Sequence, residues 1–167
     1  MHKKQIFLLR HARTNDVIMG QNDRERELTS IGLQNATRMG IYFSNKGISF
    51  DQIISSPAIR AATTAKLVAE QIKYDTENIY FNEDIYEASV RTLLATLNYL
   101  KNEWEKVLLV GHNPAISYLA EYITGEPIGN ITTCGLVNIK FNFKSWEEVG
   151  QGNGDFVEYL YPDQLNF

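Results

Sequence analysis

The N-terminal part of the chain contains the stretch that decides the fold, Gln5-Ile6-Phe7-Leu8-Leu9-Arg10-His11-Ala12-Arg13-Thr14. Its short apolar run ends abruptly in arginine and histidine. Such a run is typical of a strand that is buried on both faces and delivers charged side chains to the rim of a sheet. A second stretch repeats the pattern, Lys106-Val107-Leu108-Leu109-Val110-Gly111-His112-Asn113-Pro114. Two buried strands that each end in histidine predict one shared site.

The composition is that of an ordinary folded protein. A chain of 167 residues fits one domain, residues 1–167, with a substantial core. With 44% hydrophobic and 22% charged residues, disordered and collagen-like classes are excluded. A net charge of -4 argues against a nucleic-acid partner, which would favour a basic excess. The lone Cys134 cannot form an intrachain disulfide and is expected to be a small buried residue.

Nothing in the sequence indicates a membrane segment. The N-terminal residues 1–4 are basic, but the apolar run behind them stops after Leu9 and is too short for a signal peptide. No stretch approaches the ~18 apolar residues of a membrane span. We therefore expect a cytoplasmic protein with no membrane partner. No heptad run or long apolar patch is present, so a monomer is the default expectation.

The first half of the chain alternates between strands and helices. A polar loop, residues 12–28, follows the first strand, and Thr29 or Ser30 is expected to cap a helix. The face of that helix that should point inward is formed by Leu33, Ala36, Gly40 and Phe43. A second strand, residues 50–54, is followed by Ser55-Ser56-Pro57. These residues predict a further helix with serine as its cap and proline at its first position.

The second half continues the alternation and then changes character. A short strand is expected at 79–81, followed by a helix whose apolar stripe is formed by Val90, Leu93, Leu94, Leu97 and Trp104. The strand 107–110 leads to a helix that Asn113-Pro114 opens and Gly125 ends. Apolar and polar residues then alternate from Val137 to Phe143, and residues 156–161 form a second run. The tail therefore predicts a β-hairpin.

The order of these elements predicts the fold class. Strands that alternate with helices indicate an α/β protein, here a three-layer α/β/α sandwich with a mostly parallel sheet and a C-terminal β-hairpin. No internal repeat or interdomain linker is present.

The ends of three predicted strands bring cationic residues to one edge of the sheet. In open α/β sheets the site lies outside the carboxyl ends of the strands. Arg10 and His11 follow the first strand, Arg60 follows the second, and His112 follows the fourth. Two arginines match the oxygens of a phosphate group. A metal site is not expected, because two histidines lack a third ligand and His2 lies in the terminus.

This residue set suggests a nucleophile directed at phosphorus. Histidine can act as a covalent nucleophile and is substantially neutral near pH 7. Its ring nitrogen can attack phosphorus while the arginines hold the phosphoryl oxygens and His112 donates a hydrogen bond. Water would then hydrolyse the phosphohistidine. A carboxylic acid should protonate the leaving group and later activate the water.

Three motifs resemble those of a known family. Arg10-His11-Ala12, Ser56-Pro57-Ala58-Ile59-Arg60-Ala61-Ala62-Thr63-Thr64-Ala65 and Gly111-His112-Asn113-Pro114 look like the signature motifs of the histidine phosphatase (phosphoglycerate mutase-like) superfamily. The compact length and the run Asp23-x-x-Arg26-x-Leu28-Thr29-x-x-Gly32 are most similar to its SixA-like phosphohistidine phosphatase branch. The resemblance spans about residues 5–143.

The resemblance implies roles for particular residues. His11 would be the phosphorylated nucleophile, and Arg10, Arg60 and His112 would bind the phosphoryl group. Thr14 and Asn113 would take part in substrate binding, although Val17 stands where the family usually has an asparagine. The resemblance implies no metal and no organic cofactor.

The proton donor is the least defined role. Many members of the family carry a glutamate after the third strand, and Glu87 best matches it, with Glu83 as the second candidate. A compact member can also work without a dedicated acid. A helix-start carboxylate such as Glu87 has an ordinary structural reading too, because it stabilises the helix dipole. Arg13, Arg24 and Arg26 could widen the positive rim of the site, but ordinary solvated loop charges are the favoured interpretation.

The expected function is that of a cofactor-independent phosphatase. It would hydrolyse a phosphomonoester or a protein phosphohistidine through a phospho-His11 intermediate. Two alternatives stay open. One is a phosphoglycerate mutase-type phosphotransferase, for which the chain looks short, and the other is a phosphate-recognising module without turnover. The identity of the phosphorylated substrate is not legible in the sequence.

Overall fold

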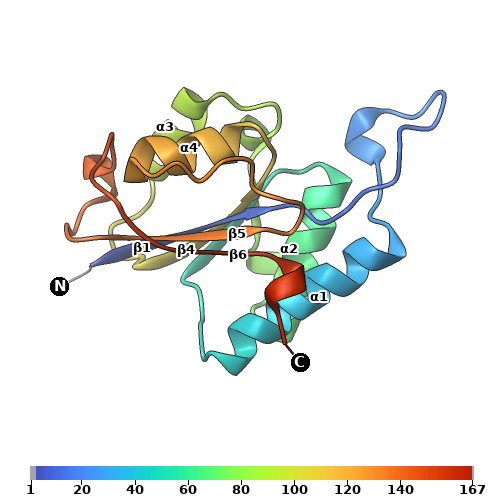
Figure 1. Cartoon of the computed structure of the whole chain (residues 1–167), viewed down its shortest axis with the longest axis horizontal. Coiled ribbons are helices and arrows are strands. Elements are labelled where there is room, and N and C mark those ends of the chain that lie inside the picture. Colours follow the sequence, from blue (N-terminus) through green and yellow to red (C-terminus); the bar gives the residue numbers. More distant parts are fainter. Residues whose placement is uncertain (1–2, 167) are drawn as a thin grey trace.

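The structure is a computed structural model that describes residues 3–166 of the chain. Its centre is a six-stranded sheet with the strand order β3-β2-β4-β1-β5-β6 (Figure 1). The strands are β1 (Lys4–Arg10), β2 (Gln52–Ser55), β3 (Tyr80–Phe81), β4 (Lys106–Gly111), β5 (Leu136–Phe141) and β6 (Asp155–Leu160). Parallel pairing joins the first four strands of this order, whereas β5 and β6 are antiparallel to their neighbours. The predicted mostly parallel sheet with an antiparallel C-terminal pair is confirmed.

Four helices cover the two faces of the sheet. α1 (Ser30–Asn45) and α2 (Ile59–Gln71) lie on one face, and α3 (Val90–Asn98) and α4 (Ala115–Thr124) lie on the other (Figure 1). The predicted three-layer α/β/α architecture is therefore confirmed. None of the helices within residues 3–166 is both long and apolar enough to cross a membrane.

Strand β1 lies in the middle of the sheet and contributes to both hydrophobic cores. Ile6 and Leu8 pack into the core beneath α3 and α4, whereas Phe7 and Leu9 pack into the core beneath α1 and α2. Because both faces are covered, every side chain of the run is apolar and the usual alternation is absent. This burial explains why the run stops where the chain reaches the rim and charged residues begin.

Helix α1 begins as the sequence predicts, but one side chain of its expected inner face points to solvent. Thr29 is the N-cap, and its hydroxyl oxygen accepts a hydrogen bond from the amide of Gly32 at 2.9 Å. Leu33 is 42% exposed, so its predicted burial is wrong. The buried face instead runs through Gly32, Ala36, Met39, Gly40 and Phe43, one helical position away from Leu33. A Cβ atom on Gly32 would lie 2.2 Å from the carbonyl oxygen of Arg13, so only glycine permits this approach.

Helix α2 begins later than predicted. Ala58 is its N-cap without a side-chain hydrogen bond, and Ile59 is its first residue, so the expected serine cap with proline at the first position is wrong. The Oγ of Ser56 accepts a hydrogen bond from the amide of Ala58 at 3.2 Å, which tightens the turn that precedes the helix. The hydroxyl group thus remains at the end of β2, where it can contact another side chain.

Two aromatic residues predicted to extend regular elements lie beyond them. α3 ends at Asn98, so Trp104 is not part of its stripe, and β5 ends at Phe141, before Phe143. The carbonyl oxygen of Trp104 accepts a hydrogen bond from the indole of Trp146, which is fully buried in the connection to β6. Trp104 and Phe143 thus pack against the hydrophobic core from connecting segments rather than from a helix or a strand. Cys134 is fully buried, as predicted.

Candidate active site

The parallel pairing of β1 with β4 places the two histidines side by side. Arg10 is in register with Gly111, so the residues that follow these two positions are also neighbours. The amide of His11 donates to the carbonyl oxygen of Gly111 at 3.1 Å. The ring centroids of His11 and His112 lie 5.3 Å apart. The structure thus brings together the two strand ends that the sequence analysis assigned to one site.

A hydrogen bond to the neighbouring backbone fixes the tautomer of His11. The side chain is buried, with 8% exposure, and its Nδ1 lies 2.7 Å from the carbonyl oxygen of Ala12. A carbonyl oxygen can only accept, so Nδ1 donates and carries the proton. In the neutral ring the lone pair is then on Nε2. Nε2 is therefore the ring nitrogen with a free lone pair.

The surroundings of His11 keep its ring uncharged. Burial lowers the pKa of His11 to about 4, against a smaller opposing effect of the hydrogen bond to Ala12. The positive charges of Arg60, Arg10 and Arg26 lower this pKa further. A protonated imidazole cannot attack phosphorus, so a low pKa preserves the nucleophile at neutral pH.

We predict that His11 titrates far below the usual pH range of histidine. Between pH 7 and pH 5 its ring should stay neutral, with the proton on Nδ1, and it should take up a second proton only near pH 4. Imidazole nitrogen NMR of 15N-labelled protein measures both the tautomer and the midpoint. The spectrum of the His11→Ala variant identifies the resonances. A midpoint near the ordinary value of ~6.5 would contradict the buried, arginine-lined environment.

His112 is oriented by Ser56. Its Nε2 lies 2.8 Å from the Oγ of Ser56, and that oxygen already accepts from the amide of Ala58. The hydroxyl hydrogen of Ser56 has no other acceptor within residues 3–166, so we assign it to Nε2 and the ring proton of His112 to Nδ1. Burial, followed by electrostatic repulsion from a protonated His11 ring and from Arg60, lowers the pKa of His112 to about 3. His112 is thus a neutral hydrogen-bonding group at physiological pH.

Arg10 is anchored by a loop that Asn113 holds in place. Nη1 of Arg10 and Nδ2 of Asn113 both donate to the carbonyl oxygen of Ile131, at 3.0 and 2.8 Å. The Oδ1 of Asn113 accepts from the hydroxyl of Ser117 at 2.6 Å. The amide of Asn113, predicted to bind substrate, is therefore occupied by structural hydrogen bonds. Its contribution to the site is indirect, through the position of Arg10.

Two buried polar atoms of the site have no hydrogen-bond partner within residues 3–166. They are Nε of Arg10 and Nδ1 of His112. Leaving a buried polar group unpaired costs about 1–3 kcal/mol, so such a group in a folded protein calls for an explanation. Both atoms belong to side chains beside His11. A ligand with several acceptor oxygens would satisfy them.

Arg60 is held by a residue that the sequence analysis did not assign to the site. Its Nη1 donates to the carbonyl oxygen of Asp23 at 2.8 Å, and its Nη2 lies 3.0 Å from Oδ2 of the same residue. Arg26 pairs with Oδ1 of Asp23 at 3.1 Å, and the hydroxyl of Tyr86 donates to Oδ2 at 2.6 Å. Asp23 thus bridges three side chains around the pocket. The interpretation of Arg26 as a solvated loop charge is wrong, because it is half-buried and takes part in this network.

The remaining predicted site residues lie at the rim. Thr14 accepts a hydrogen bond from Nη2 of Arg26 at 2.6 Å, so its hydroxyl supports the network around Asp23. Glu83 pairs with Arg24 at 2.7 Å, and this hydrogen bond lowers the pKa of Glu83. Glu87 is exposed and has a φ of 54°, the left-handed region that costs a non-glycine residue about 1–3 kcal/mol. Lys73 and Cys134 share this backbone conformation, so the strain alone assigns no role to Glu87. Glu87 differs from Glu83 in that its carboxylate is not paired with Arg24.

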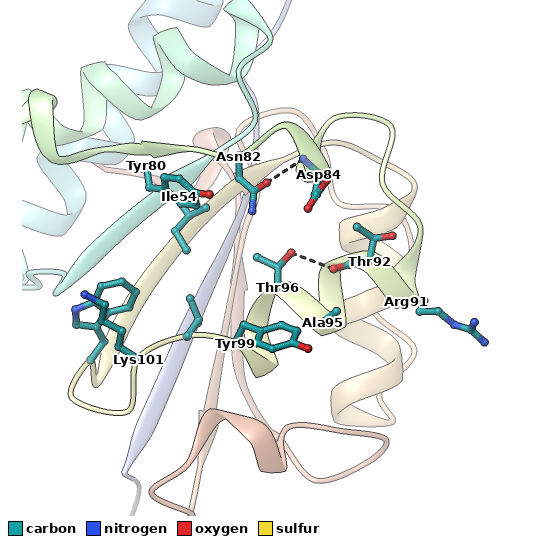
Figure 2. A pocket seen from close by; sticks show the side chains of 12 residues that line it. Ile54, Tyr80, Asn82, Asp84, Arg91, Thr92, Ala95, Thr96, Tyr99 and Lys101 are labelled. Atoms are coloured by element: carbon teal, nitrogen blue, oxygen red, sulfur yellow. Dashed lines mark hydrogen bonds between the residues drawn. The ribbon is translucent and has the colours of Figure 1, made fainter.

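A pocket away from the two histidines lies on another part of the described chain. It has a volume of about 650 Å³ and lies between α3 and the strands β2 and β3 (Figure 2). Its walls include the aromatic side chains of Tyr80, Tyr99 and Trp104, and neither histidine lines it. Within residues 3–166, no group of three or more His, Cys, Asp or Glu side chains could hold a metal ion.

The fold and the site define a class of protein. A neutral histidine at the end of a central parallel strand, a second histidine beside it, the buried Arg60 and the partly buried Arg10 are arranged as the motifs of a histidine phosphatase predict. The sequence profile of the histidine phosphatase superfamily (branch 1) matches residues 6–93. The chain therefore belongs to this superfamily, as its motifs predicted.

Individual relatives cover different parts of the chain. The mitochondrial serine/threonine-protein phosphatase Pgam5 of Drosophila ananassae is 37% identical over 76 residues, which is 46% of this chain and 26% of Pgam5. The chain thus matches about a quarter of the length of that relative. An uncharacterised chloroplastic protein of Arabidopsis thaliana is 25% identical over 177 residues, covering 98% of this chain and 80% of that protein.

Solved structures share the fold over nearly the whole chain. The putative phosphohistidine phosphatase SixA from Agrobacterium tumefaciens superposes with a TM-score of 0.82 at 24% identity, covering 97% of this chain and 100% of SixA. A structure of the protein histidine phosphatase SixA complexed with tungstate superposes with a TM-score of 0.84 at 24% identity, covering 97% and 99% of the two chains. At this identity the similarity shows the fold alone.

Proposed function

We propose that this protein is a cofactor-independent phosphatase that works through a phosphohistidine at His11. The observation that carries this proposal is the hydrogen bond from Nδ1 of His11 to Ala12, which leaves the lone pair on Nε2. Three guanidinium groups act on the same ring and would attract an anionic substrate. Nucleophile and anion site therefore coincide.

The first step transfers the phosphoryl group to the enzyme. Nε2 of His11 attacks phosphorus in line, a P–N bond forms, and the bond to the leaving oxygen or nitrogen breaks. The unpaired Nε of Arg10 and Nδ1 of His112 would donate to the phosphoryl oxygens. Fixed positive charge around a dry site stabilises the transferring group without reorganisation. The proton of His11 stays on Nδ1, where it is hydrogen-bonded to the carbonyl oxygen of Ala12. Phosphorylation of Nε2 therefore gives the imidazole a positive charge that favours the later release.

The second step releases phosphate. Water attacks phosphorus from the side that the leaving group vacated, the P–N bond to His11 breaks, and inorganic phosphate departs. One proton of the water molecule goes to a carboxylate, and the lone pair returns to Nε2. The same carboxyl group can protonate the leaving group first and accept this proton afterwards.

Glu87 is the carboxyl group that we assign to this role, and its effect should depend on the leaving group. A Glu87→Gln variant should lose about 10²-fold in turnover of an alkyl phosphate, whose alkoxide leaves poorly without a proton. It should lose less than about 10-fold with 4-nitrophenyl phosphate, because that leaving group is stable as an anion. Steady-state kinetics with both substrates measure the difference.

The ion-paired neighbour provides the matched control for Glu87. Glu83→Gln should affect both substrates equally and by a small factor, because Glu83 is engaged by Arg24 at the rim. If Glu83→Gln shows the leaving-group dependence and Glu87→Gln does not, the assignment moves to Glu83. Equal small losses in both variants would indicate that no dedicated acid is used.

The substrate class that we propose is a phosphorylated protein, with phosphohistidine as the preferred group. The fold is that of the SixA phosphohistidine phosphatases, and a phosphoramidate nitrogen is easily protonated as it leaves. The exposed position of Glu87 suits a leaving group that needs little help. A panel of phosphohistidine, phosphotyrosine, phosphoserine and small sugar phosphates, compared by kcat/KM, tests this preference.

Trapping the intermediate tests the mechanism. Brief incubation with a 32P-labelled phosphoester, followed by alkaline quenching, should leave label on the protein that acid releases and base does not. The His11→Ala variant should carry none. Equal labelling of the two proteins would exclude phospho-His11. Loss of activity in the presence of a chelator would instead indicate a metal hydrolase.

A further inference from the structure

Asp23 occupies an unusual position for an acidic residue in a site that should bind an anion. It belongs to a short 3-10 helix, Asp23–Glu25, in the loop between β1 and α1. Its carboxylate contacts Arg26, Arg60 and Tyr86, and its backbone carbonyl contacts Arg60 as well. Neither the family motifs nor the strand ends assign it a role. Its contacts show what that role is.

Asp23 binds the end of the Arg60 guanidinium and leaves one side of the group free. The backbone oxygen and Oδ2 of Asp23 take the two terminal nitrogens, Nη1 and Nη2. Nε of Arg60 makes no hydrogen bond to any residue within 3–166. A guanidinium is a rigid planar fork, so fixing its end leaves the side edge, formed by Nε and Nη2, for another acceptor pair. The side chain is only 8% exposed, and its charge acts on both His11 and His112.

Asp23 is itself held firmly enough to serve as an anchor. The hydroxyl of Tyr86 and the guanidinium of Arg26 donate to its two carboxylate oxygens at 2.6 and 3.1 Å. The hydrogen bond from Tyr86, followed by those from Arg26 and Arg60, holds the pKa of Asp23 far below its usual range. The carboxylate therefore stays charged at any physiological pH and does not act as a proton donor. It is a permanent anion on the outer side of the pocket.

We propose that Asp23 is a positioning residue that holds Arg60 so that its side edge faces the phosphoryl group on His11. The proposal rests on the phosphatase function proposed above and deepens it. Asp23 acts only through Arg60 in this scheme and touches no reacting atom. Asp23 is an anion, so its charge repels a bound phosphate. Its hydrogen bonds to Arg60 nevertheless improve the position of a donor to the phosphoryl group in the transition state.

This combination predicts a split between turnover and ground-state affinity. The Asp23→Ala variant should lose about 10- to 10²-fold in kcat, because a donor that is out of place contributes less to the transition state. Its inhibition constants for inorganic phosphate and tungstate should stay equal or fall, because one negative charge has been removed. A general disruption of the pocket would instead weaken both quantities. The temperature of thermal unfolding should fall somewhat, because the mostly buried guanidinium of Arg60 loses its ion-pair partner.

A double-mutant cycle tests whether the effect passes through Arg60. In an Arg60→Ala background, the further change Asp23→Ala should alter kcat by less than about 2-fold, because the group it positions is gone. Tyr86→Phe removes one of the anchoring hydrogen bonds and should give an intermediate loss. Glu25→Ala is the matched control, since it lies in the same 3-10 helix, is exposed and should leave kcat unchanged.

Several outcomes would overturn the proposal. If Asp23→Ala lowers kcat by the same factor in the wild-type and Arg60→Ala backgrounds, Asp23 acts independently of Arg60. If it weakens phosphate and tungstate binding as strongly as turnover, it maintains the pocket rather than the orientation of one group. If kcat is unchanged, it has no positioning role. These results are distinguishable from failure of the proposed function, which would appear as equal labelling of the wild type and His11→Ala.

Discussion

Replacing His11 with alanine is expected to abolish turnover, with a loss of at least about 10⁴-fold in kcat, the order seen when a covalent nucleophile is removed. The structural reason is specific to one atom. Nε2 of His11 carries the lone pair in a pocket where three guanidinium groups act on the ring. No other side chain in the described pocket offers an uncharged nucleophile in that position, because Nε2 of His112 is occupied by Ser56. Initial rates with 4-nitrophenyl phosphate measure the loss.

The folded state should survive this substitution. The side chain of His11 makes one hydrogen bond, to the backbone of its own neighbour, so alanine removes no hydrogen bond that joins two elements. Between elements it removes the ring contact with His112. Circular dichroism and tungstate binding should remain close to those of the wild type. A His11→Gly variant offers a further check, because free imidazole should restore part of its turnover. Residual activity above about one tenth of the wild type would contradict the assigned nucleophile.

Replacing Arg60 with alanine is expected to lower kcat by about 10²- to 10³-fold, which is typical when one preorganised charged donor is removed from a transition state. Arg60 is the buried guanidinium whose terminal nitrogens are held by Asp23 while its charge acts on both histidines. Lysine should not restore turnover, because an ammonium group is a point charge without a planar fork.

The neighbouring arginine at the rim provides the comparison for Arg60. Arg24 pairs with the exposed Glu83 and lies over the ring of Tyr86 at 4.9 Å. Arg24→Ala should therefore change kcat by only a few-fold. If Arg24→Ala were as damaging as Arg60→Ala, the phosphoryl group would lie further out in the pocket than the unpaired atoms of Arg10 and His112 indicate.

The central strands and the residues that end them are legible in the sequence. β1 and β4 are buried on both faces, so their side chains must be apolar until the chain reaches the rim. The parallel register then makes the positions after the strands neighbours, which is why His11 and His112 could be paired without knowledge of the structure. Arg60 is placed by the same rule, through β2 and the turn before α2. Buried regular elements are therefore predictable from pattern and topology.

The side chains that hold Arg60 in place were not predicted, because they belong to a loop. Asp23 and Arg26 belong to residues 12–28, where no hydrophobic period fixes the direction of any side chain. Asp23 and Arg26 do belong to the run that resembles the SixA-like branch, and this was the one signal in the sequence for their importance. A sequence motif does not say which side chains its residues contact. Ser56 was read as a helix cap, since serine before proline favours that role. In the structure the hydroxyl of Ser56 instead contacts the imidazole of His112. His112 follows β4, so this contact could not be predicted from the residues around Ser56.

The buried thiol of Cys134 is protected from reagents that modify cysteine. Its side chain is fully covered, and burial raises the pKa of the thiol to about 12, so almost no thiolate is present. Alkylating agents and mild oxidants act on the thiolate, and the cysteine-dependent phosphatases lose activity to them for that reason. This protein should keep its turnover after iodoacetamide or peroxide treatment. The proposed dephosphorylation through His11 uses no thiolate, so it would be insensitive to oxidants that inactivate cysteine-dependent phosphatases.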